Sequence, residues 1–236
     1  MTTSKIEWTD ISWNPVTGCT KVSAGCKNCY AEKMSKRLQA MNIEKYKDGF
    51  SVIKSHEEAL LAPFNWKRTK RVFVNSMSDL FHEKVPKAFI QKVFQVMKSN
   101  PQHNFQVLTK RAERLAKLSP YLNWSDNIWM GVSVESEKFL SRVDLLKSTE
   151  AKVKFLSLEP LLGPLHQLNV DGIDWVIVGG ESGYKARLMN PFWVNHIQTI
   201  CQNTNTPFFF KQWGGPHKKE KGRVLNGKTY SQFPPI

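Results

Sequence analysis

The sequence has few cysteines and few acidic residues, and it lacks a long apolar run. No apolar stretch reaches the roughly 18 residues that a membrane-spanning helix needs, and residues 1–10 lack the apolar core of a signal peptide. We therefore expect a cytoplasmic protein that has no membrane partner and keeps its thiols reduced. The chain has only 20 acidic residues but 34 lysines and arginines, so its formal net charge is +14. This surplus favours a polyanionic partner, DNA or RNA first, although it would also serve solubility alone.

Three of the four cysteines lie within eleven residues, at Cys19, Cys26 and Cys29. Their spacing is C-x6-C-x2-C. Clustered thiols in a reducing compartment indicate metal binding rather than disulfides, and thiolates prefer soft metals such as iron–sulfur clusters and zinc. Three protein ligands suit a cluster with one open metal position, whereas a structural zinc site normally needs four ligands. His56 or His82 would supply that fourth ligand, and unligated thiols are the third interpretation.

Two lysines lie close to the clustered cysteines in the sequence, and the fourth cysteine lies far from them. Lys21 and Lys27 lie inside the cysteine segment, and we expect them to lower the pKa values of the thiols. Cys201 stands alone in an apolar segment and is expected to be an inert core thiol.

Short β-rich runs alternate with amphipathic segments along most of the chain. We expect strands at 72–75, 105–108, 128–134, 153–158, 175–178 and 208–210, and helices at 88–97, 111–118, 138–146 and 191–201. Such alternation predicts βα units and a parallel sheet. The expected fold is therefore α/β, a complete or partial (β/α) barrel, with an open doubly wound sheet as the alternative. Residues 1–215 would form a single barrel-like domain with an insertion at 43–70, and residues 216–236 a basic C-terminal tail.

Polar residues follow six of the expected strands, where a βα barrel carries its active site. These strand ends are Asn75–Asp79, Thr109–Arg111, Ser133–Glu135, Glu159–Pro160, Gly179–Gly183 and Lys211–Trp213. A shared site at one rim is therefore expected.

Two further segments, Trp66–Arg71 and the one that starts at Trp213 and continues into the tail, combine cations with tryptophan. Cations neutralise phosphates and aromatic rings stack on unpaired bases, so these segments would flank a nucleic-acid groove along the rim. The alternative is a solvated charge run beside a core tryptophan. The candidate nucleic-acid-binding residues are Trp66, Lys67, Arg68, Lys70, Arg71, Lys211, Trp213, Lys218 and Lys219.

The cysteine loop followed by a βα series resembles radical S-adenosylmethionine (SAM) enzymes. It is more similar still to a phage-associated three-cysteine family of uncharacterised function. The resemblance rests on GCTKVSAGCKNCYAE at 18–32, VLTKR at 107–111, GVSVE at 131–135, FLSLEPLLGP at 155–164, WVIVGGESG at 175–183 and FFFKQWGG at 208–215. A looser similarity to spore photoproduct lyase lies in the strand ends at 108–110 and 132–133. The usual radical SAM spacing is C-x3-C-x2-C, and Asn28 stands where an aromatic residue commonly precedes the third cysteine.

The resemblance implies a [4Fe-4S] cluster on the three cysteines, SAM, and an electron donor as a partner. It implies a 5′-deoxyadenosyl radical that acts on a nucleic acid or nucleotide. Lys110 would pair with the SAM carboxylate, and Ser133 and Glu135 would hold the ribose hydroxyls. Glu159 would hold the methionyl amine or the substrate. The full SAM-binding set implied is Tyr30, Lys110, Ser133, Glu135, Glu159, Gly179, Gly180 and Glu181.

Two other functions compete with this one. The first is a non-catalytic nucleic-acid-binding protein with a structural zinc site. The second is a metal-dependent hydrolase, which the sequence disfavours because the strand ends carry no histidine.

Overall fold

The computed structural model describes residues 4, 6–216 and 222–235. Every strand and helix expected from the sequence is present. The strands are β4 (Arg71–Val74), β5 (Asn104–Thr109), β6 (Ile128–Ser133), β7 (Val153–Leu158), β8 (Trp175–Gly179) and β9 (Phe208–Gln212). The helices are α2 (Lys87–Lys98), α3 (Ala112–Leu118), α4 (Ser141–Lys147) and α5 (Pro191–Asn203).

Three short strands and one α-helix lie in the N-terminal quarter, where no element was expected from the sequence. They are β1 (Ile11–Trp13), β2 (Val16–Thr17), α1 (Tyr30–Ala40) and β3 (Lys54–Ser55). β1 pairs in parallel with β4 and so becomes the first strand of the main sheet. None of the described helices is long and apolar enough to cross a bilayer.

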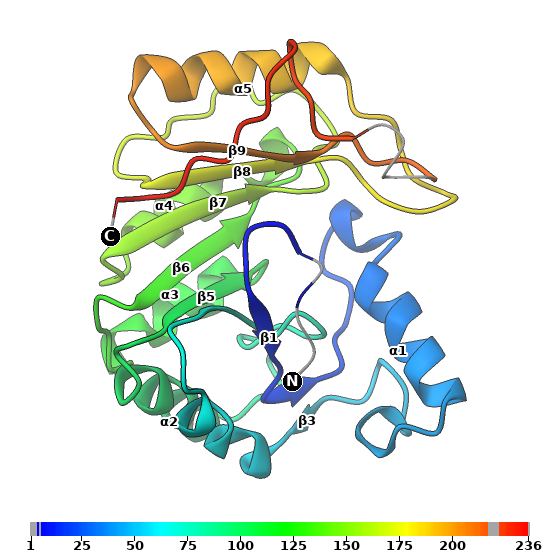
Figure 1. The fold of residues 1–236 in the computed structure, drawn as a ribbon, viewed down its shortest axis with the longest axis vertical. Helices are drawn as coiled ribbons and strands as arrows, with labels where there is room; N and C mark the ends of the chain where they lie inside the picture. The colour runs from blue at the N-terminus through cyan, green and yellow to red at the C-terminus, as the bar shows by residue number, and fades with distance from the viewer. Residues whose placement is uncertain (1–3, 5, 217–221, 236) are drawn as a thin grey trace.

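The main sheet has seven parallel strands in the order β1-β4-β5-β6-β7-β8-β9. Figure 1 shows the sheet curling around its own axis, with α2 to α5 on the outside. Spatial order follows chain order, so each crossover packs on the same face of the sheet. A doubly wound sheet would reverse its order, and the expected partial (β/α) barrel is confirmed.

The two faces of the sheet have different partners because strand residues alternate between them. The outer face packs its valines, isoleucines and leucines against the helices in one large core. The inner face carries a separate aromatic cluster near the amino ends of the strands. Its members are Trp8, Phe73, Trp129, Phe155, Trp175, Ile177 and Phe209, with Phe233 packed against them.

Residues 43–70, which interrupt the alternation of strands and helices, contact the segment that carries the three cysteines. β3 pairs antiparallel with β2, and the Cys19 amide donates to the Phe50 carbonyl at 2.8 Å. Gly18 has φ +83°, and a Cβ there would lie 2.0 Å from the Val52 carbonyl oxygen. Only glycine fits so close an approach.

The C-terminal segment 222–235 runs back along β9 toward the amino ends of the strands (Figure 1). The Phe210 amide donates to the Tyr230 carbonyl at 3.1 Å. The Trp175 indole donates to the Gln232 carbonyl at 2.8 Å, which brings Phe233 onto the inner aromatic cluster.

Candidate functional site

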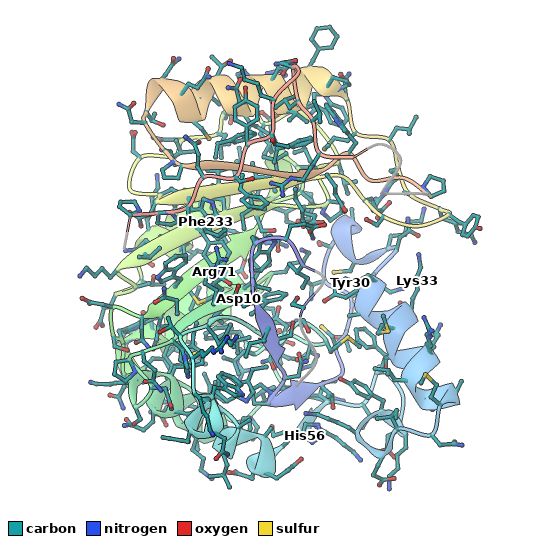
Figure 2. All side chains as sticks on the ribbon, viewed as in Figure 1. Asp10, Tyr30, Lys33, His56, Arg71 and Phe233 are labelled. Carbon is teal, nitrogen blue, oxygen red and sulfur yellow. The ribbon has the colours of Figure 1, made fainter. Side chains whose placement is uncertain are left out.

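The six polar strand ends lie along one edge of the sheet because all seven strands are parallel. The segment 18–30, here called the cysteine loop, is attached to that edge. At one end Gly18 forms a parallel bridge with Ser78, which follows β4. At the other end the Tyr30 hydroxyl donates to the Ser76 carbonyl, and Figure 2 shows Tyr30 on the side of α1 that faces the barrel. The predicted rim and the cysteines are therefore brought together.

Glu135, after β6, holds the middle of the cysteine loop. Its side chain is fully buried. One carboxylate oxygen accepts from the Gly25 amide at 3.2 Å, and the other accepts from Arg142 at 3.0 Å. Arg142 also donates to the Ser133 carbonyl at 2.8 Å. Both carboxylate oxygens thus have protein partners, and in this structure they support the loop.

Glu181, after β8, holds the loop at a second point. It accepts from the Asn28 amide group and from Arg187 Nε, both at 2.9 Å. Arg187 also donates to the Ala24 carbonyl at 2.9 Å. Burial alone would raise the pKa of Glu181, but the hydrogen bonds from Arg187 and Asn28 lower it to about 2. The carboxylate is therefore ionised at any ordinary pH and can anchor both donors.

Arg111, after β5, provides the third point of attachment. Its guanidinium donates to the Thr20 carbonyl and hydroxyl, each at 3.1 Å. Asp79 braces this strand end, because it accepts from the Thr109 hydroxyl at 2.7 Å and from the Lys110 amide at 3.1 Å. The loop is thus held from β5, β6 and β8.

The three thiols themselves are free and partly exposed. The Cys19 thiol donates to the Thr20 carbonyl at 3.5 Å, and Cys26 Sγ lies 3.8 Å from the Ser23 hydroxyl. Within the described part of the chain, no group of three or more His, Cys, Asp or Glu side chains is arranged to hold a metal ion. The donor set matches a soft metal in kind, although the sulfurs are not gathered around one point.

The expectation that nearby lysines lower the thiol pKa is wrong for Cys19. Burial, reinforced by the negative charge of Asp79, raises the pKa of this thiol to about 12, and the opposing effect of Arg111 is smaller. Lys21 pairs with Glu32 at 3.1 Å instead. Lysines close in sequence therefore do not control the charge of Cys19.

Neither histidine considered as a fourth zinc ligand has a free ring nitrogen. His82 Nε2 hydrogen-bonds the Thr20 hydroxyl at 2.8 Å, and its Nδ1 accepts from the Lys84 amide. His56 bonds Thr17 at 2.8 Å through Nε2 and Glu58 at 3.2 Å through Nδ1. Burial lowers the pKa of both imidazoles, so both are already satisfied as neutral rings.

Three of the predicted SAM-binding residues, Glu159, Gly179 and Gly180, gather with Lys211 at the carboxyl ends of β7, β8 and β9. Lys211 Nζ lies 2.8 Å from both carboxylate oxygens of Glu159. A Cβ at Gly179 would lie 3.1 Å from the Glu159 carboxyl carbon. A Cβ at Gly180 would lie 2.0 Å from the Trp213 carbonyl oxygen, so chain packing alone demands this glycine. Lys211, expected both at the rim and among the nucleic-acid-binding residues, lies at the rim, where it pairs with Glu159.

The basic run before β4 lies at the opposite end of the sheet from the cysteine loop. Lys67, Arg68 and Lys70 precede β4, and parallel pairing places its amino end away from the rim. Arg71 binds Asp10 and lies over the Phe233 ring at 4.4 Å; Figure 2 shows these three residues together, apart from Tyr30. The expectation that this run and the tail flank one groove along the rim is thus corrected.

Two tryptophans in the basic segments have protein partners. Trp66 is only 9% exposed, and its ring packs 5.4 Å from His103 in the outer core, so it offers no open face for base stacking. Trp213 is half-buried; it packs on Phe210 and donates to the Val224 carbonyl at 2.8 Å. Lys218 and Lys219 lie outside the described residues.

Sequence reasoning missed several residues that hold the loop: Asn28, Asp79, Arg111, Arg142 and Arg187. Asp79 and Arg111 lie in strand ends that the sequence had marked as polar. Arg187 carries no such signal, because it reaches Ala24 across 163 positions of sequence.

Residues 3–234 match the model of a family described as "Protein of unknown function (DUF5131)". No curated protein matches the chain. One similar solved structure is described as spore photoproduct lyase complexed with dinucleoside spore photoproduct, with 10% sequence identity and a TM-score of 0.48. The match covers 86% of this chain and 63% of that one, so the chain spans less than two thirds of that protein's length.

Proposed function

We propose that this chain, which belongs to the DUF5131 family of unknown function, is an iron–sulfur enzyme that uses SAM. The observation that carries the proposal is the position of the cysteine loop. Hydrogen bonds that Arg111 donates and that Glu135 and Glu181 accept hold the loop on the carboxyl edge of a (β/α) half barrel. Catalytic groups collect at that edge in βα barrels, and here the edge receives the chain's only clustered thiols.

Cys19, Cys26 and Cys29 would hold the cluster. Reduced thiols are soft donors, and the satisfied ring nitrogens of His56 and His82 favour a three-thiolate set over a four-ligand zinc site. The side chains would have to turn toward one another. Binding would also release protons, because the ligating form is the thiolate. The Cys19 thiol resists ionisation, so the metal has to stabilise its anion.

The rim residues would position SAM. Lys110 lies beside the loop, since a Cβ on Gly25 would come within 3.4 Å of its side chain, and it would pair with the SAM carboxylate. Glu159, held by Lys211, would receive the methionyl amine. When bound, a [4Fe-4S] cluster would supply the electron that cleaves the S–C5′ bond of SAM, giving methionine and a 5′-deoxyadenosyl radical. A separate electron donor would serve as partner, and the substrate would be a nucleic acid or nucleotide.

Anaerobic reconstitution tests the proposal. Protein loaded with iron and sulfide should absorb broadly in the visible, and Cys19→Ala, Cys26→Ala and Cys29→Ala should each abolish that absorbance. Cys201→Ala is the matched control, since this buried thiol lies in α5, far along the sequence from the loop. With a strong reductant, loaded protein should convert SAM to 5′-deoxyadenosine, and Lys110→Ala should weaken SAM binding.

Two results would overturn the proposal. Native protein that holds stoichiometric zinc and no iron would support the structural-zinc alternative. A reconstituted and reduced cluster whose electron paramagnetic resonance signal is unchanged by SAM would exclude SAM as its ligand.

A further inference from the structure

A groove of about 430 Å³ lies beside the cysteine loop, between the residues that follow β5 and those that follow β6. Val22 of the cysteine loop forms one wall, and Phe139 contributes to the other. Five basic and two acidic side chains line the groove, so its field is positive. They are Lys110, Arg111, Arg114, Lys138 and Arg142, with Glu83 and Glu113.

The basic residues of the groove divide into fixed and free cations. Arg111 is tied to Glu83 at 2.7 Å and Arg142 to Glu135 at 3.0 Å, so these two charges are neutralised locally. Arg114 donates to the neutral carbonyls of Phe81 and Val85 and keeps its charge.

The two lysines of the groove are the free cations. Neither the Lys110 nor the Lys138 ammonium has a hydrogen-bond or ion-pair partner among the residues that the structure describes. Two unpaired ammonium groups in a groove with rigid guanidinium walls are suited to a ligand that brings its own negative charge.

We propose that this groove binds the phosphodiester backbone of a single-stranded nucleic acid, with a phosphate at Lys138, and leads the strand toward the cysteine loop, where Lys110 is kept for the SAM carboxylate. Lys138 is exposed at the outer part, and Lys110 lies against Gly25 at the loop itself. Val22 gives apolar contact for a base, and Phe139, over whose ring Arg142 lies at 4.1 Å, lines the opposite wall. The inference rests on the proposed function only in calling this strand the substrate and in keeping Lys110 for SAM.

The position of the groove beside the cysteine loop favours a single strand over a duplex. The bases of a single strand are already accessible, whereas a duplex would need its target base extruded before chemistry. The groove also replaces the basic run at 67–71 as the nucleic-acid site, because that run lies at the opposite end of the sheet.

Fluorescence anisotropy with labelled single-stranded DNA and RNA oligonucleotides, and with a DNA duplex, tests the inference on protein without a cluster. Lys138→Glu should weaken single-strand binding by about tenfold at low salt. It should also reduce the slope of log K against log salt by about 0.7, the value for one phosphate contact on a single strand. The matched control is Lys67→Glu, an exposed lysine of the basic run, which should bind like the unmodified protein.

Several outcomes would overturn the inference. One is loss of binding in Lys67→Glu with none in Lys138→Glu, and another is a preference for the duplex. Absence of binding to any oligonucleotide at low salt would also overturn it. Because the assay needs neither cluster nor SAM, binding without SAM cleavage would refute the proposed function and leave the groove assignment standing.

Discussion

The two ends of the half barrel use the same strands for different purposes. Near the amino ends, inward-facing positions carry aromatic rings, and both ends of the chain contribute: Trp8 lies 4.7 Å from Phe73, and Phe233 lies 5.0 Å from Trp175. At the carboxyl ends, strand-end positions carry carboxylates and cations, such as Glu135 and Lys211. One end is closed by apolar burial, and the other holds the cysteine loop by polar contacts.

The difference shows how one fold separates stability from function. Aromatic burial is non-directional and large, so the amino end can supply much of the folding free energy. The ion pairs at the rim are directional. The cost of removing their charges from water offsets much of the electrostatic attraction between them. They fix the position of the loop more than they stabilise the chain. Changes at the amino end should therefore act on global stability, and changes at the rim on the loop.

The largest effect should come from Trp175→Ala. Trp175 is fully buried and contacts the rings of Trp8, Trp129, Phe155 and Phe209. We expect the free energy of unfolding to fall by roughly 3–5 kcal/mol, because the lost burial leaves a cavity that the rigid sheet cannot fill. Urea denaturation followed by circular dichroism measures it.

The matched control for this change is Phe192→Ala. Phe192 is 80% exposed, so its truncation should shift the free energy of unfolding by no more than about 0.5 kcal/mol. Equal losses in the two variants would mean that the inner aromatic cluster does not stabilise the amino end.

The sequence was sufficient to predict the barrel because its signal is local. Apolar residues make up most of the strand at 153–158 and recur at helical spacing over 88–97, and the structure has β7 at Val153–Leu158 and α2 at Lys87–Lys98. The convergence of the strand ends then follows from parallel pairing alone. β1 was not predicted because a strand of three residues is too short to show an apolar periodicity.

The contacts around the cysteine loop could not be predicted because they join residues far apart in the sequence. Gly25 meets Glu135 across 110 positions and Asn28 meets Glu181 across 153. Burial likewise depends on the completed fold: Trp66 stands beside cations in the sequence and inside the core in space. Charge near a cysteine was equally misleading, since burial dominates the pKa of Cys19.

A smaller global effect, with a clear local one, should follow from Glu135→Gln. The amide can still accept from the Gly25 N–H, but Arg142, which is only 5% exposed, loses its carboxylate. We expect the free energy of unfolding to fall by roughly 1.5–3 kcal/mol, the range for a hydrogen bond to a charged group. Amide hydrogen exchange read by mass spectrometry should quicken across residues 18–30 more than in β8.

Glu150→Gln is the control, because it removes the same charge from an exposed position in the loop after α4. Its stability and its exchange pattern should match those of the unmodified protein. Uniformly faster exchange in Glu135→Gln, without a focus on the loop, would show that Glu135 serves the core and not the loop.

The smallest effect should come from Arg187→Ala, and its size depends on pH. Arg187 is one-third exposed, so screening by water limits the loss to about 1 kcal/mol near neutral pH. Its partner Glu181 has a pKa of about 2, below the usual value of 4.5, so the ionised form stabilises the fold above about pH 4.5. That contribution fades as the pH falls toward 2, and the difference in the free energy of unfolding between variant and unmodified protein should shrink with it.

The control is Lys185→Ala, which removes an exposed cation from the same segment and should show no such trend. Urea denaturation from about pH 6 to pH 3 decides the matter, and a difference that stays constant over this range would mean that Arg187 acts through the Ala24 carbonyl rather than through the charge of Glu181.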